Sequence, residues 1–101
     1  EKYFELIFQR RPVHSLYTYF NYAYFLAKQG QREKGEKYVK EIIQLFPQNH
    51  LVLIHAANFY ILIKEYDKAL EYAKKNYDLF PNRKNKNFFL KIEEIIKKRI
   101  N

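Results

Sequence analysis

Three prolines divide the chain at nearly equal intervals, and this spacing constrains the fold more than any other feature of the sequence. Pro12, Pro47 and Pro81 are the only prolines in the chain, and the two intervals between them differ by a single residue. Proline lacks a backbone N–H and clashes with the preceding helical turn, so we expect a helix to end before each one. A fixed interval of about 34 residues is typical of a repeat architecture.

Two windows of the sequence, 16–49 and 50–83, support this interpretation. They align without gaps, share eight identical residues, and both contain a Leu-Phe-Pro sequence near their end. Apolar residues recur at helical spacing within each window. Gly30 supplies the left-handed conformation that a tight turn between two helices needs. The pattern predicts two helices in each window, at 15–29, 31–46, 50–63 and 66–79, and Ser15 is a candidate N-cap for the first.

The two ends of the sequence extend the same pattern. Residues 1–12 look like the second helix of an incomplete repeat, because Pro12 falls where Pro47 and Pro81 fall. We therefore expect the chain to be a fragment of a longer protein. Residues 86–100 have an isoleucine and phenylalanine face opposite charged residues, which predicts an amphipathic end helix within 84–101.

The repeat resembles the tetratricopeptide repeat family, whose pattern is W-x2-L-G-x2-Y, then A-x3-F, then P in a unit of about 34 residues. In the second window the matching places are taken by Leu53, Ala56, Ala57, Tyr60, Ala69, Ala73 and Pro81. In the first they are taken by Tyr19, Tyr22, Ala23, Leu26, Gly35, Val39 and Pro47. The signature Trp and Gly are missing, and a pentatricopeptide RNA-binding repeat is the nearest rival.

The resemblance implies an all-α fold, a right-handed α-solenoid of antiparallel helix hairpins. It would comprise a half repeat (1–12), two full repeats (16–49 and 50–83) and a capping helix (84–101). It also implies a non-enzymatic scaffold that binds a peptide or helical segment of a partner protein in a concave groove. The groove residues carried over by position are Tyr17, Phe20, Asn21, Tyr24, Lys28, Leu51, Ile54, His55, Asn58 and Leu62.

The spacing of these residues places them on one helix face. Residues 17, 21, 24 and 28 step by four, three and four, and residues 51, 55, 58 and 62 take the same steps one repeat later. Packing between helices is an equal alternative for Phe20 and Ile54. Polar amides such as Asn21 and Asn58 would need partners if buried, so a solvent-lined surface suits them better.

The composition argues against catalysis and against a bound cofactor. The chain has no Cys, only two Gly, and three His whose closest pair is five residues apart. It therefore lacks a thiolate nucleophile, a glycine-rich phosphate loop and the i,i+4 histidine pair of a helical metal site. No apolar run is long enough to span a bilayer, so we expect no insertion into a membrane.

Two alternative functions remain open. The net charge is +8, and residues 82–101 contribute +5 of it. A basic patch there could bind nucleic acid or an anionic membrane. An ordinary solvated end helix also explains the charge, so nucleic acid is the less favoured partner. Its residues are Arg83, Lys84, Lys86, Lys97, Lys98 and Arg99, with Lys91 on the same helix. The second alternative is a homo-oligomer formed through the apolar face of the N-terminal half repeat.

Overall fold

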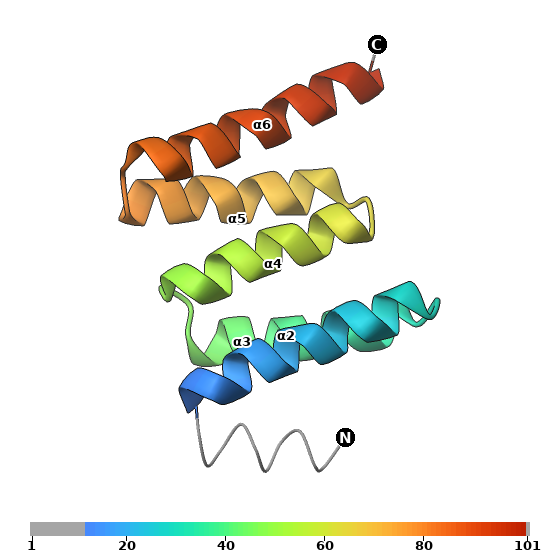
Figure 1. Cartoon of the computed structure of the whole chain (residues 1–101). Helices are drawn as coiled ribbons and strands as arrows, with labels where there is room; N and C mark the ends of the chain where they lie inside the picture. Colours follow the sequence, from blue (N-terminus) through green and yellow to red (C-terminus); the bar gives the residue numbers. More distant parts are fainter. Residues whose placement is uncertain (1–11, 101) are drawn as a thin grey trace. The chain divides into compact units, whose positions relative to one another are not determined.

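A computed structural model describes the backbone of residues 12–100 and the side chains of residues 18–99 (Figure 1). This part of the chain is entirely helical, as the sequence predicts. The helices are α2 (Pro12–Lys28), α3 (Arg32–Leu45), α4 (His50–Leu62), α5 (Tyr66–Leu79) and α6 (Arg83–Ile100). The chain divides into two compact units between Leu45 and Phe46. The predicted helix at 1–12 lies outside the described residues, apart from Pro12, which begins α2.

The first unit contains the hairpin of α2 and α3. Tyr19, Ala23 and Leu26 of α2 are buried, as are Tyr38, Val39 and Ile42 of α3. The rings of Tyr19 and Tyr38 meet edge to face at 5.0 Å, and the Tyr19 hydroxyl donates a hydrogen bond to Glu41 Oε2 at 2.7 Å. Four of these buried residues, Tyr19, Ala23, Leu26 and Val39, occupy places of the repeat pattern. The hairpin therefore packs through the residues that carry the repeat.

The start of α2 differs from the sequence prediction. The helix begins at Pro12 and runs through Ser15, so Ser15 is an interior residue and its assignment as the N-cap is wrong. The physical reason is that proline suits the first helical position. Its ring fixes φ near the helical value, and its missing N–H would have no helical partner there.

The turn inside each hairpin has the same geometry in both units. Gly30 has a φ of +85°, and the Gln31 N–H donates to the Leu26 carbonyl oxygen at 2.8 Å. In the second unit, one repeat later, Lys64 has a φ of +64° and the Glu65 N–H donates to the Tyr60 carbonyl oxygen at 2.8 Å. A left-handed residue with a 6→1 hydrogen bond is the Schellman ending of a helix. The sequence identified this turn only where it contains glycine.

The second unit begins with the hairpin of α4 and α5. The Asn49 side chain caps α4 by accepting hydrogen bonds from the Leu51 and Val52 N–H groups. The Tyr60 and Tyr72 rings stack at 5.7 Å across the hairpin. All the helical residues that match the family pattern in this window are buried, and these are Leu53, Ala56, Ala57, Tyr60, Ala69 and Ala73.

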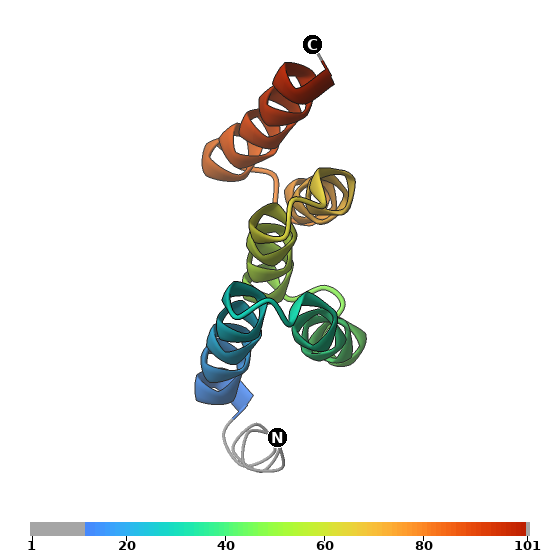
Figure 2. The same ribbon diagram turned by 90° about the vertical axis from the view of Figure 1, so that its right-hand side faces the viewer.

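Helix α6 packs against α5 within the second unit. The Asn82 side chain accepts a hydrogen bond from the Asn85 N–H at 2.8 Å, so the helix starts at Arg83, slightly earlier than predicted. Ile92 is buried, and the Phe89 ring stacks on Tyr77 at 6.3 Å. Figure 2 shows α4 (lime green) and α6 (red) in one column, with α5 (yellow to orange) set to the right of it. None of the helices in the described residues is long and apolar enough to cross a membrane.

Candidate functional site

The predicted groove residues of α2 lie on a partly exposed face of the first unit. Asn21 and Lys28 are exposed, and Tyr24 between them is half-buried. The Tyr24 ring lies 6.4 Å from the ring of Phe20, and burial raises the pKa of the Tyr24 hydroxyl. The side chain of Tyr17 falls outside the described residues. This face thus presents an amide, a neutral phenol and an ammonium group to solvent.

Phe20 does not belong to that face. Its side chain is only 1% exposed, so it serves packing rather than partner contact. This burial favours packing, the stated alternative for this residue, over contact with a partner. The reason is local, because Phe20 shares a helix face with the buried Ala23, three residues further on.

The equivalent face of α4 is the more apolar of the two. Leu51 is 52% exposed and Leu62 is 39% exposed, although both are large aliphatic residues. Asn58 between them is exposed, and His55 and Ile54 are half-buried. Burial lowers the pKa of the His55 imidazole and so favours its neutral form. The two leucines are separated by three turns of the helix, which is about 16 Å along its axis.

We call the set Leu51, Ile54, His55, Asn58 and Leu62 the α4 stripe. It combines exposed aliphatic groups with an amide and a neutral imidazole, both of which form hydrogen bonds. Such a surface can hold a folded or extended peptide by apolar contact and can orient it through its polar groups. The α4 and α2 faces belong to separate units, and each is a surface in its own right.

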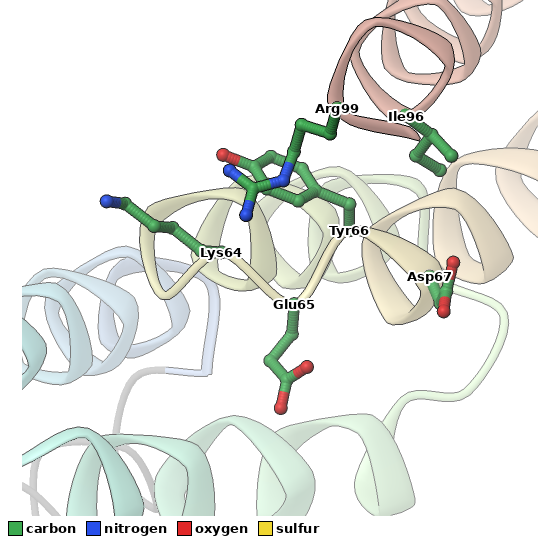
Figure 3. A pocket seen from close by; sticks show the side chains of 6 residues that line it. All are labelled: Lys64, Glu65, Tyr66, Asp67, Ile96 and Arg99. Atoms are coloured by element: carbon green, nitrogen blue, oxygen red, sulfur yellow. The ribbon is translucent and has the colours of Figure 1, made fainter. Parts of the chain in front are cut away.

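A pocket of about 270 Å³ opens at the turn between α4 and α5, beside the end of α6 (Figure 3). The Arg99 guanidinium lies 4.9 Å above the Tyr66 ring. Figure 3 shows Glu65 and Asp67 pointing away from Arg99, so the acidic and basic groups do not converge. The remaining lining residues are Lys64 and Ile96. The sequence did not identify this pocket, because Tyr66 and Arg99 are distant in sequence and share no motif.

The pocket offers no pairing of a nucleophile with a base. Among the side chains that the structure describes, no group of three or more His, Asp or Glu residues is arranged to hold a metal ion. The pocket is therefore a shallow surface feature with a cation stacked on an aromatic ring.

A buried polar contact joins the ends of α4 and α5. The His50 Nδ1 atom lies 2.9 Å from the Asn76 Oδ1 atom, and the His50 ring meets Phe80 edge to face at 5.4 Å. Asn76 is fully buried, and its Nδ2 atom has no hydrogen-bond partner among the described residues. The repeat could have indicated that Asn76 is buried, because this residue takes the position of the buried Ile42 in the first window.

The predicted basic patch lies along α6, and all its residues are exposed: Arg83, Lys84, Lys86, Lys97, Lys98 and Arg99. Lys98 pairs with Glu94 at 3.7 Å, and both side chains are largely in solvent. Such an exposed pair contributes little to stability. The patch therefore remains available as a charged surface.

No protein-family model, no curated protein and no solved structure matches this chain. The tetratricopeptide resemblance therefore stays a prediction from the repeat pattern of the sequence.

Proposed function

We propose that this chain is a non-enzymatic scaffold that binds a peptide or helical segment of a partner protein. The observation that carries the proposal is the α4 stripe, where Leu51 and Leu62 are left in solvent on either side of Asn58. Exposed aliphatic groups that share one helix face with hydrogen-bonding groups are what a helix or strand of a partner would cover.

The repeat supports the same proposal from a second direction. The α2 face has an exposed Asn21, a half-buried Tyr24 and an exposed Lys28 at positions one repeat before those of the α4 stripe. Both faces carry hydrogen-bonding groups next to larger, partly exposed side chains, which supports the interpretation that α2 and α4 present comparable binding faces. We further propose that the hairpins belong to a solenoid of the tetratricopeptide type, on the strength of the repeat pattern and its buried signature residues.

The test compares two pairs of exposed leucines. The first variant is Leu51→Ala with Leu62→Ala, which removes the apolar ends of the α4 stripe. The control is Leu79→Ala with Leu90→Ala, in the same unit but off the stripe, where the exposed fractions are 39% and 45%. The two variants lose the same atoms, so their thermal unfolding should change equally.

The original chain and both variants are used to capture proteins from a nuclease-treated lysate of the source cells, with quantification by mass spectrometry. We expect a protein that the original chain and the control retain and that the stripe variant loses. Titration of that purified protein should give at least a tenfold weaker Kd for the stripe variant, since two leucine contacts contribute about 1 kcal/mol or more each when buried. Equal retention by all three chains would refute the proposal.

A further inference from the structure

The helices α4 and α6 start with the same cap, and this fixes how their faces correspond. Asn49 accepts a hydrogen bond from the Val52 N–H, three residues on, and Asn82 accepts one from the Asn85 N–H, also three residues on. The interval from Asn49 to Asn82 is one residue shorter than the interval between the two windows. When the two caps are taken as equivalent, Val52 corresponds to Asn85 and Phe59 corresponds to Ile92, and all four side chains are buried.

The same correspondence relates the five positions of the α4 stripe to α6, and three of them keep their degree of exposure. The half-buried Ile54 corresponds to the exposed Asn87, and the exposed Leu62 corresponds to the half-buried Ile95. Leu51 and Asn58, both exposed, correspond to Lys84 and Lys91, which are also exposed. His55, half-buried, corresponds to the half-buried Phe88. Both helices pack against α5, and Figure 2 shows them in one column on the same side of it. The exposed positions of α4 thus have counterparts on α6, within the same unit, in Lys84, Phe88 and Lys91, and a ligand segment that bridges the two helices would contact both sets.

The charge on this combined surface has one sign. Neither the α4 stripe nor its set of α6 counterparts contains Asp or Glu. Lys84 and Lys91 form no ion pair within the described residues. They are seven residues apart, which places them about 10.5 Å from each other along the helix axis. Two unpaired ammonium groups therefore border an apolar stripe.

We propose that the partner segment is an acidic amphipathic helix, with its apolar face on Leu51 and Leu62 and its carboxylates against Lys84 and Lys91. This inference rests on the proposed function and adds the chemistry of the partner and two further binding residues. Carboxylates two helical turns apart on the partner would match the spacing of the two lysines.

The surface suits an acidic helix better than a nucleic acid. A nucleic acid would use the lysines and leave the leucines of the α4 stripe without contact, because phosphate recognition is electrostatic. Only a segment that is apolar on one side and acidic on the other uses both halves of the surface.

The test uses synthetic peptides and the whole chain. The first peptide is a fluorescein-labelled helix of about five turns with leucines on one face and glutamates on the other. The second has lysines in place of the glutamates, and the third has the residues of the first in scrambled order. Fluorescence anisotropy gives Kd in 50 mM and 500 mM NaCl for each peptide. The variant Lys84→Glu with Lys91→Glu is compared with a control, Lys74→Glu with Lys75→Glu, which changes the net charge equally through exposed residues of α5.

We expect the acidic peptide to bind at least tenfold more tightly than the basic and scrambled ones. Each exposed ion pair is worth up to about fivefold in affinity, so reversing Lys84 and Lys91 should weaken binding by up to about 25-fold in 50 mM NaCl. The control should weaken it less than about threefold, and 500 mM NaCl should narrow the difference between the variants because salt screens exposed charges.

Three outcomes would overturn the inference. Equal binding of the acidic and basic peptides, with both lost in the Leu51→Ala, Leu62→Ala variant, would leave the proposed function standing but remove the acidic partner. Failure of every amphipathic peptide to bind would count against both. The third outcome concerns a labelled single-stranded oligonucleotide. If reversal of Lys84 and Lys91 abolishes binding of the oligonucleotide but leaves binding of the acidic peptide unchanged, the two lysines bind nucleic acid instead.

Discussion

Replacing Lys64 by glycine should stabilise the chain, because Lys64 holds the left-handed conformation that Gly30 holds one repeat earlier. The φ of Lys64 is +64°, where the Cβ atom of an L-residue crowds the backbone at a cost of roughly 1 to 2 kcal/mol. Glycine removes that cost but makes the unfolded chain more flexible, which costs about 0.4 to 1 kcal/mol. The net gain is about 0.5 to 1 kcal/mol, and it should raise Tm by roughly 2 to 6 °C for a domain of this size.

Thermal unfolding followed by circular dichroism measures this, with two companion variants. Lys64→Ala removes the same charge and side-chain length but keeps the crowded Cβ, so its stability should remain near that of the original chain. Gly30→Ala should destabilise by about 1 kcal/mol, and only through φ, because a Cβ atom at Gly30 would meet nothing within 4 Å. The reasoning is refuted if Lys64→Gly is no more stable than Lys64→Ala.

Three further predictions concern the second unit. Asn76→Leu should raise the free energy of unfolding by about 1 kcal/mol, because it removes a buried amide nitrogen without a partner. The loss of the hydrogen bond to His50 offsets only part of this gain. Urea unfolding measures the difference, and a lower urea midpoint would contradict the prediction. Burial lowers the pKa of His55 below its ordinary 6.5, so the folded chain holds fewer protons than the unfolded chain below that pH, and stability should fall as the pH drops below about 6.5. His55→Gln should flatten this slope between pH 7.5 and 5, and an unchanged slope would refute it. Ile92→Ala should destabilise by about 2 to 4 kcal/mol because the side chain is 1% exposed, whereas Leu90→Ala on the exposed face should cost less than about 0.5 kcal/mol in the same unfolding assay.

The helices and their order could be predicted from the sequence because two signals coincide along most of the chain. Apolar residues at helical spacing mark the packed faces, and proline marks the ends of α3 and α5, which stop at Leu45 and Leu79. The error at Ser15 arose where those signals conflict. The proline spacing places Pro12 at the end of one helix, but proline also suits the first turn of the next, and the sequence alone does not distinguish the two uses.

The candidate site was predicted less well, because exposure depends on packing that a spacing rule does not contain. The rule places Phe20 beside Asn21, but one is buried and the other is exposed. The α6 counterparts were missed for a related reason. Lys84 and Lys91 were grouped with other cations of α6, and their correspondence with Leu51 and Asn58 depends on the Asn82 cap, which shortens the interval between equivalent positions by one residue.

Differences between equivalent positions point to function more directly than the repeat itself. Where the repeat is kept, as in the turns at Gly30 and Lys64, a backbone conformation is preserved even though the residue has changed and the new residue fits it less well. Where the chemistry of the exposed face changes, packing does not require the change, since both Leu51 and Lys84 are in solvent. The difference between Leu51 and Lys84 is therefore the feature that the proposed acidic amphipathic partner would have to match, and the peptide titrations test it directly.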